Sequence, residues 1–198
     1  MGKNSNDGIL WKRITQNDEG AFSIVFDMYF IRLCNYCYPI VNKTEAAEEI
    51  VSEVFTKLWI KRHSIQIKVD LKSYLFRAVK NTALNFLRQV SDQVSLDDAN
   101  VNELESFYVA DSKLIDDEVN AKLEQILKSL SPQQSLVLRM YKLEGFSQAE
   151  IAEVLSVSKK TVQNHIYLAI KTLTEQRSKY RYEFYFAYIL LTINILQI

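Results

Sequence analysis

The sequence contains few of the residues that make turns. Gly and Pro together account for six of the 198 residues, whereas average usage would give about 12%. This scarcity argues against sandwiches, barrels and glycine-rich phosphate-binding loops, and it favours long helices. The chain has only two cysteines and two histidines. Cys34 and Cys37 form a lone Cys-Asn-Tyr-Cys motif without the further ligands of a zinc site or the strand–helix setting of a redox motif. We favour a structural role on a helix face over metal or redox chemistry, and we expect no cofactor.

The chain also lacks net charge, because 24 Lys and Arg balance 24 Asp and Glu. Nucleic-acid-binding domains are usually basic, so neutrality argues at first against that class. The charge is unevenly distributed, however. Residues 57–90 carry eight basic residues and one acid, net +7, residues 91–120 carry net −8, and residues 121–178 carry net +3. Asymmetry of this kind is itself a signal for contact with nucleic acid.

Long apolar runs are absent except at the C-terminus. Residues 1–20 contain no apolar run, so we expect no secretory signal and a cytoplasmic protein. Residues 184–198 are almost entirely apolar, but 15 residues fall short of the roughly 20 that span a bilayer. Three interpretations stay open for this tail: packing against the C-terminal domain, contact with a regulator, or attachment to a membrane surface. We favour a packing or partner-binding helix.

Apolar residues at spacings of three and four predict an all-α protein with two small helical domains. Three helices are predicted in the first domain, over residues 18–40, from about 45 to 62, and over 71–89. Pro39 predicts a break or kink, Asn42 with Glu45 an N-cap, and Asp70 a cap for the third helix. The predicted domains are residues 1–90 and 118–178, separated by an acidic linker over 91–117 and followed by the tail over 179–198.

The second domain contains a predicted helix-turn-helix over residues 147–169. Ser131-Pro-Gln-Gln and Ser147-Gln-Ala-Glu are strong helix starts, and Gly145 predicts a helix end. Val157 is expected to anchor the turn between the two helices and Ser158 to cap the second. Ser156 stands where such turns usually have Gly. Ile151, Ala152, Leu155, Val162 and Ile166 fall where two short crossing helices would bury them.

The second helix of this motif would present groups that reach phosphates and base edges in a major groove. An ordinary helical hairpin is the plain alternative, but the ordered caps and apolar positions favour DNA binding. The residues expected to read duplex DNA are Ser158, Lys159, Lys160, Thr161, Gln163, Asn164, Tyr167 and Lys171.

The helix over 71–89 is basic and aromatic. It contains four cations and no acid, interleaved with Tyr74, Phe76 and Phe86. Cations hold backbone phosphates, and aromatic and amide groups can take up unstacked bases. A solvated basic face over a packed core explains the same composition equally well from the residues alone.

Residues 18–30, 46–59 and 71–88 resemble region 2 of the extracytoplasmic-function (ECF) sigma factors, which belong to the sigma-70 superfamily of bacterial transcription initiation factors. Residues 130–138 and the helix-turn-helix resemble region 4 of that family. Two unrelated modules in the family's order are more specific than either one alone, and the chain length suits the ECF group.

The resemblance implies two DNA contacts and a set of protein partners. The helix over 45–61 would dock on the β′ clamp of core RNA polymerase, and the second module would approach the β flap. Loop 62–70 and helix 71–88 would recognise and open the −10 element, with capture of a flipped base. The helix-turn-helix would read the −35 element, the linker would run through the polymerase, and an anti-sigma factor would be a further partner.

The implied site residues in the first module form two sets. Those expected at the −10 element are Lys68, Lys72, Ser73, Tyr74, Arg77, Lys80, Asn81, Asn85 and Arg88. Those expected to contact or pack toward core polymerase are Glu48, Glu49, Glu53, Phe55, Leu58 and Trp59.

The acidic linker has two readings. An acidic strand can occupy a basic channel built for nucleic acid, or it can be a soluble tether.

Two other functions remain as alternatives to a promoter-specificity subunit. The first is a stand-alone helix-turn-helix regulator, which does not explain the segment around Trp59 or the linker. The second is a protein that sequesters another sigma factor and binds no promoter itself. No nucleophile–base pair, metal cluster or phosphate loop is evident, so we do not expect an enzyme.

Overall fold

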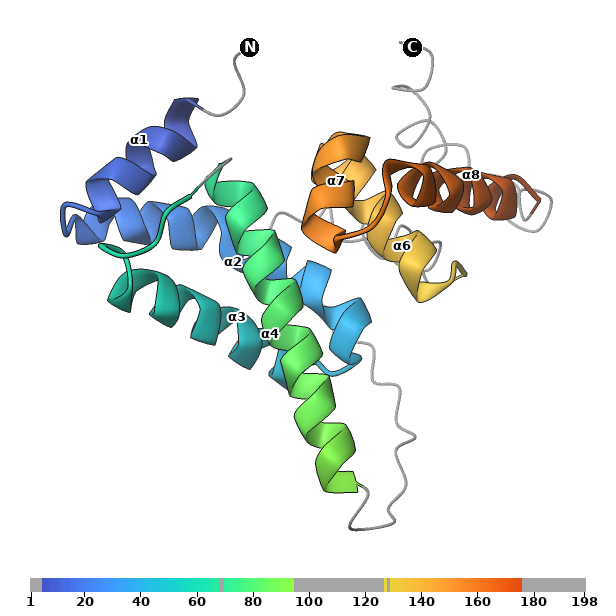
Figure 1. Cartoon of the computed structure of the whole chain (residues 1–198), viewed down its shortest axis with the longest axis horizontal. Coiled ribbons are helices and arrows are strands. Elements are labelled where there is room, and N and C mark those ends of the chain that lie inside the picture. Colours follow the sequence, from blue (N-terminus) through green and yellow to red (C-terminus); the bar gives the residue numbers. More distant parts are fainter. Residues whose placement is uncertain (1–4, 68–69, 95–126, 128, 176–198) are drawn as a thin grey trace, which may run out of the picture. The chain divides into compact units, whose positions relative to one another are not determined.

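The computed structural model describes residues 5–67, 70–94, 127 and 129–175 (Figure 1). The chain divides into two compact units, unit 1 (Met1–Ser106) and unit 2 (Phe107–Ile198), and each has its own buried core. All regular structure in the described ranges is helical, which confirms the all-α prediction. The predicted linker lies largely outside the described residues.

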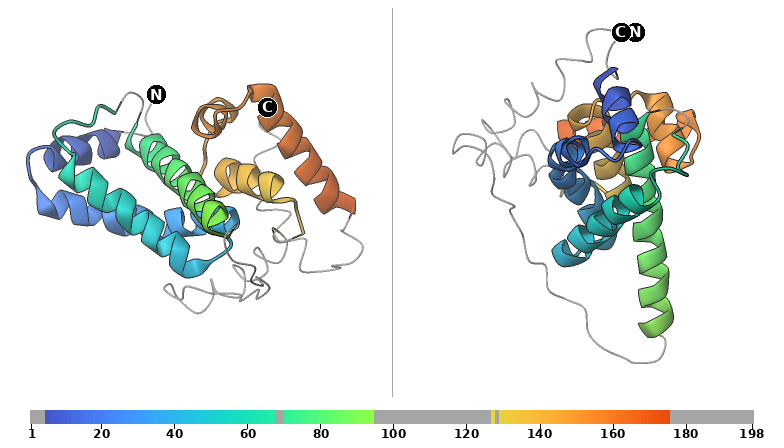
Figure 2. Two further views of the ribbon diagram at one scale, coloured as in Figure 1. Left: turned by 60° about the horizontal axis from the view of Figure 1, so that its bottom comes forward. Right: turned by 90° about the vertical axis from the view of Figure 1, so that its left-hand side faces the viewer.

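Helix α2 (Glu19–Val41) is the central element of unit 1. It packs against α1 (Ser5–Ile14), α3 (Thr44–Ile60) and α4 (Leu71–Val94), and α4 crosses the pair formed by α2 and α3 (Figures 1 and 2). The helices predicted over 18–40, 45–62 and 71–89 are therefore confirmed to within a few residues. The largest fully buried side chains of this core are Phe55, Phe76, Ile14, Leu33, Leu58, Leu71, Leu75, Val25 and Val51.

Helix α1 was not predicted, because its apolar signal is short. Only Leu10 and Ile14 bury apolar side chains, and the third buried position is occupied by Asp7, which is 8% exposed. The Tyr29 hydroxyl donates a hydrogen bond of 2.6 Å to the Asp7 carboxylate. Burial, followed by this hydrogen bond, raises the pKa of Tyr29. Asp7 thus attaches α1 to α2 through a polar contact that hydrophobic periodicity does not reveal.

The junction between α2 and α3 differs from the prediction in two ways. Helix α2 continues through Pro39 to Val41, so the proline does not end the helix. Asn42 adopts a left-handed conformation (φ 53°) and donates its N–H to the Tyr38 carbonyl at 2.7 Å. A residue that closes one helix in this conformation cannot supply the extended backbone of an N-cap. The predicted cap at Asn42 is wrong: Lys43 occupies the N-cap of α3, without a side-chain hydrogen bond.

Asp70 starts α4 as predicted. Its carboxylate accepts hydrogen bonds from the backbone N–H and the hydroxyl of Ser73, both at 2.8 Å. The helix then extends to Val94, about five residues beyond the predicted end. Its inner face carries Leu75, Phe76 and Val79, all 0% exposed.

Unit 2 contains α6 (Pro132–Leu138), the π-helix η1 (Arg139–Leu143), α7 (Gln148–Leu155) and α8 (Lys159–Glu175) among its described residues. Both predicted capping boxes are present, at the starts of α6 and α7, and Gly145 has the positive φ (67°) expected of a helix stop. The buried apolar residues of this unit are Leu127, Leu130, Val137, Leu138, Met140, Phe146, Ile151, Val154, Val162, Ile166, Ala169 and Leu173.

Candidate nucleic-acid interface

Helices α7 and α8 form the predicted helix-turn-helix. Ser156 takes the left-handed conformation of the turn (φ 58°, ψ 43°), which is the conformation that explains why Gly is common there. The Ser158 hydroxyl accepts a hydrogen bond of 3.0 Å from the Thr161 N–H and so caps α8, as predicted. Val157 is 40% exposed, so the prediction that it anchors the turn is wrong. The backbone makes the anchor instead, because the Val157 N–H donates to the Ala152 carbonyl at 3.0 Å.

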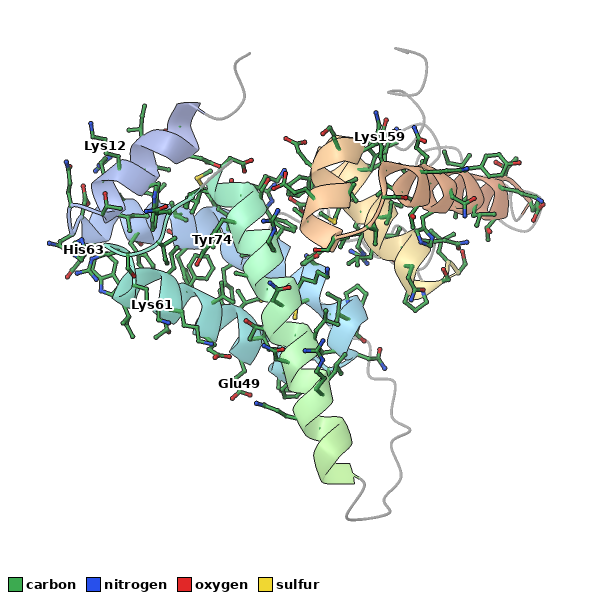
Figure 3. The ribbon with its side chains drawn as sticks, in the orientation of Figure 1. Lys12, Glu49, Lys61, His63, Tyr74 and Lys159 are labelled. Carbon is green, nitrogen blue, oxygen red and sulfur yellow. The ribbon has the colours of Figure 1, made fainter. Side chains whose placement is uncertain are left out.

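The outer face of α8 carries most of the residues predicted to meet duplex DNA. Tyr167 is 64% exposed, and Thr161 is half-buried beside the cap. Lys159 lies at the start of the helix (Figure 3), where the backbone N–H groups also favour an anion such as phosphate. The exposed members of the predicted set are Ser158, Lys159, Lys160, Gln163, Asn164 and Lys171.

Gln163 is connected to the first helix of the motif. Its side-chain N–H donates a hydrogen bond of 3.2 Å to the side-chain oxygen of Gln148, the first residue of α7. The sequence analysis did not single out Gln148, because the two residues lie 15 positions apart. A glutamine that is oriented by a second glutamine loses less side-chain entropy when it contacts a base, so Gln148 is a candidate positioning residue.

Helix α4 presents the second predicted DNA surface. Asn81, Asn85 and Arg88 are exposed, and the Arg88 guanidinium donates to the Asn85 amide oxygen at 3.2 Å. Ser73 differs from the prediction, because it is 5% exposed and its hydroxyl is bonded to Asp70. Lys68 lies outside the described residues. The half-buried members of the predicted set are Lys72, Tyr74, Arg77 and Lys80.

Two of these half-buried groups have altered acidity. Burial raises the pKa of the Tyr74 hydroxyl, which is protonated at neutral pH even at its ordinary pKa of about 10 and can donate a hydrogen bond. Burial, together with the neighbouring Arg77, lowers the pKa of Lys80. Bound phosphate would reverse the effect on Lys80, since an opposite charge favours the charged amine.

Helix α3 has the acidic face that the sequence predicted. Glu49 (Figure 3) and Glu53 are exposed, and Glu48 is half-buried. Phe55 and Leu58, predicted as contact or packing groups, are 2% and 0% exposed. Their burial assigns both to packing. The 3.6-residue period places residues on one face of a helix, but it does not say whether another helix covers that face.

An aromatic cluster covers the buried Phe55. The rings of Phe22, Phe26 and Phe30 lie 6.0, 4.9 and 6.4 Å from the Phe55 ring, and Trp59 lies 5.0 Å from Phe22. Trp59 is half-buried, with the Arg62 guanidinium 4.1 Å above its ring.

The two cysteines are free and buried in α2. Burial is the main reason that the pKa of each thiol is raised to about 12, with smaller contributions from Glu48 for Cys34 and from Cys34 for Cys37. No group of three or more His, Cys, Asp or Glu within the described residues could hold a metal ion. Thiols of this kind are poor nucleophiles at neutral pH.

Among the described helices, none is both long and apolar enough to cross a membrane. The apolar tail over 184–198 lies outside the described residues, so its three interpretations stay open.

Comparisons with known proteins match both modules in the same order. The family model "Sigma-70 region 2" matches residues 25–92, and "Sigma-70, region 4" matches residues 120–173. The ECF RNA polymerase sigma factor SigW of Bacillus subtilis is 26% identical over 176 residues, covering 83% of this chain and 93% of SigW. The RNA polymerase sigma-H factor of Pseudomonas aeruginosa is 24% identical over 172 residues, covering 82% and 89%.

Two solved structures share the fold. The sigma factor RpoE from Bartonella quintana, in complex with the anti-sigma factor NepR, has a TM-score of 0.64 at 21% identity and covers 81% of this chain and 98% of RpoE. CnrH, in complex with the cytosolic domain of CnrY, has a TM-score of 0.60 at 18% identity and covers 89% and 99%.

Proposed function

Because the chain belongs to the ECF group of the sigma-70 family, we propose that it joins core RNA polymerase and directs it to promoters through two separate DNA-binding surfaces. It is a transcription initiation factor. The observation that carries the assignment of surfaces is the pair of cation- and amide-bearing helix faces, one on α4 in unit 1 and one on α8 in unit 2.

Unit 1 supports the −10 role. The outer face of α4 offers Asn81, Asn85 and Arg88 to DNA, with Tyr74 as a half-buried aromatic at the end of the helix nearest loop 62–70. Amides can bond the edges of unstacked bases, aromatics stack on them, and cations hold the phosphates on either side. The acidic face of α3 supports docking on a basic surface of the polymerase β′ clamp.

Unit 2 supports the −35 role. Lys159, Lys160 and Lys171 are spaced along the exposed side of α8 for phosphate contacts, while Gln163 and Asn164 lie between them for base edges. Unit 2 is also the part that we propose to lie near the β flap. An anti-sigma factor is a further proposed partner, since RpoE of Bartonella quintana was solved with one.

A stand-alone helix-turn-helix regulator is less well supported. Such a regulator needs unit 2 only, whereas the sigma-70 family models match both units in the family's order. A protein that sequesters another sigma factor would not need the cationic, amide-bearing face of α8.

The proposed function is tested by reconstitution. The protein is mixed with core RNA polymerase and genomic DNA of the bacterium that encodes it, and the 5′ ends of the transcripts are sequenced. We expect new start sites that share −10 and −35 sequences and that disappear when the protein is omitted. Transcripts identical to those of core polymerase alone would overturn the proposal. Binding of the free protein to DNA does not substitute for this test, because sigma factors of this kind often bind DNA poorly without core polymerase.

The Gln148–Gln163 pair makes a prediction about −35 specificity. Gln163→Ala should reduce discrimination at one base pair by about 1–3 kcal/mol, and Gln148→Ala should reduce it at the same base pair by about 0.5–1.5 kcal/mol, the value of one hydrogen bond. The measurement is competition binding of the reconstituted holoenzyme to promoters that differ at single −35 positions. Gln133→Ala, on the exposed side of α6, is the matched control. A Gln148→Ala variant that weakens binding equally at every sequence would show that Gln148 does not position Gln163.

A further inference from the structure

One end of unit 1 gathers basic side chains from two segments that are distant in sequence. Lys12 and Arg13 close α1, and Lys61, Arg62 and His63 follow directly after α3. Figure 3 shows Lys12, Lys61 and His63 at the same end of the unit. We call these five residues the terminal basic cluster.

Asn17 holds the two halves of the terminal basic cluster together. It has a left-handed backbone (φ 67°) in the turn between α1 and α2. Its side-chain oxygen lies 2.8 Å from the Arg62 Nε, which donates to it, and 3.1 Å from the His63 Nε2. These contacts bridge 45 and 46 positions of sequence. A turn residue with no catalytic or core role is thus used to fix the positions of basic side chains.

The positive charge of the cluster is only partly neutralised. Asp7, Asp18 and Glu19 are the acids nearest in sequence to Lys12 and Arg13, against four lysines and arginines. Asp7 is buried and accepts the hydrogen bond from Tyr29. Asp18 is already occupied: its carboxylate accepts from the Arg13 Nε at 2.9 Å and from the Ala21 N–H at 2.9 Å. Arg62 is fixed over the Trp59 ring. Lys12, Lys61 and His63 remain exposed to solvent.

The terminal basic cluster adjoins the loop that the proposed function assigns to base capture. Lys61–Ser64 forms a turn that leads into residues 65–67 and on to the Asp70 cap. A base that enters this loop brings its own backbone with it, so the phosphates on one side of the base must pass close to the turn. Exposed lysines beside an ordered turn suit the phosphodiester backbone that would pass there.

We propose that the terminal basic cluster binds the phosphodiester backbone of the DNA strand whose base is held by loop 62–70, with Lys12 and Lys61 as its principal contacts. The cluster extends the −10 surface beyond α4 to α1, a helix that the sequence did not predict. This inference rests on the proposed function. The contact is to backbone only, so it adds affinity without adding sequence preference.

The test measures how DNA binding by the holoenzyme depends on salt. Core polymerase is reconstituted with the unchanged full chain, with Lys12→Gln and with Lys61→Gln, and each holoenzyme is titrated with a labelled single-stranded −10 oligonucleotide between 50 and 200 mM KCl. Loss of one phosphate contact on a single strand makes the negative slope of log K against log salt shallower by about 0.7. Between 50 and 200 mM KCl, the factor by which affinity falls should therefore be roughly two- to threefold smaller for each variant than for the unchanged holoenzyme. Both variants should bind more weakly at 50 mM KCl, by the same factor for matched and mismatched −10 sequences.

Lys43→Gln is the matched control, because it removes one exposed lysine at the other end of α3, about 25 Å from Lys61 along a helix of this length. Slopes for Lys12→Gln and Lys61→Gln equal to that of Lys43→Gln would overturn the inference while leaving the proposed function intact. An unchanged slope with weaker binding to core polymerase would also overturn it, since the cluster would then contact protein. If the unchanged holoenzyme shows no preference for promoter DNA, the proposed function fails and the inference fails with it.

Discussion

Replacing Phe76 with alanine is expected to lower the free energy of unfolding of unit 1 by about 3–5 kcal/mol. Phe76 is 0% exposed, and its ring lies 4.8 Å from that of Tyr36. The substitution removes buried aromatic surface and leaves a cavity between α2 and α4. Both tryptophans of the chain, Trp11 and Trp59, lie in unit 1, so tryptophan fluorescence during denaturation of the full chain reports on this unit alone.

Tyr74→Ala is the matched comparison for this experiment. Tyr74 lies two positions earlier on α4 and is half-buried, so its truncation should cost less stability while removing an aromatic group from the proposed −10 surface. We expect Tyr74→Ala to fold and to impair promoter opening. A Phe76→Ala protein within about 0.5 kcal/mol of the original, the range of ordinary surface substitutions, would mean that the inner and outer faces of α4 are assigned the wrong way round.

Native Cys34 and Cys37 are expected to react with iodoacetamide at pH 8 at least about 10³-fold more slowly than the same residues in the unfolded chain. The reactive species is the thiolate, and an unperturbed thiol has a pKa of about 8.5. With the pKa of each thiol raised to about 12, the thiolate fraction at pH 8 falls by about that factor. Mass spectrometry of samples quenched over time, with and without denaturant, gives both rates.

The same two thiols link stability to pH with a defined sign. Above about pH 8.5 the unfolded chain releases thiol protons that the folded chain retains. The folded state then binds more protons than the unfolded state, so the free energy of unfolding should fall as the pH rises from about 8.5 toward 12. Native alkylation as fast as in denaturant, or ready formation of a disulfide between the two residues, would favour the redox interpretation of the Cys-Asn-Tyr-Cys motif.

Helix caps, turns and helix positions could be predicted from the sequence where residues of a single short segment determine them. The capping boxes at Ser131 and Ser147 and the cap at Asp70 depend on residues three positions apart, and all three are present. The turn at Ser156 was located even though serine replaces the usual glycine. Helix periodicity likewise identified α2, α3, α4, α7 and α8.

Contacts between distant segments were not readable in the same way. The hydrogen bond between Tyr29 and Asp7 attaches α1 to α2 across 22 positions, so the sequence did not predict α1. The hydrogen bond from Arg62 to Asn17 spans 45 positions. No periodic pattern encodes either contact. The family resemblance placed Ser73 on the DNA-binding side of α4, whereas its side chain is buried and bonded to Asp70. Asn42 was predicted as an N-cap because the same residue type also closes helices in the left-handed conformation.

The π-helix at Arg139–Leu143 has a consequence for how this chain can change over generations. A π-helical turn holds one residue more than the α-helical turn it replaces, and one residue corresponds to about 100° of rotation. Phe146, 3% exposed, lies three residues beyond its end and donates its N–H to the Met140 carbonyl at 3.0 Å. Deletion of one codon within the π-helix should turn Phe146 away from the core and change the orientation of α7 and α8 together. A one-residue deletion here would therefore act mainly by reorienting the helix-turn-helix, and only slightly by shortening the chain.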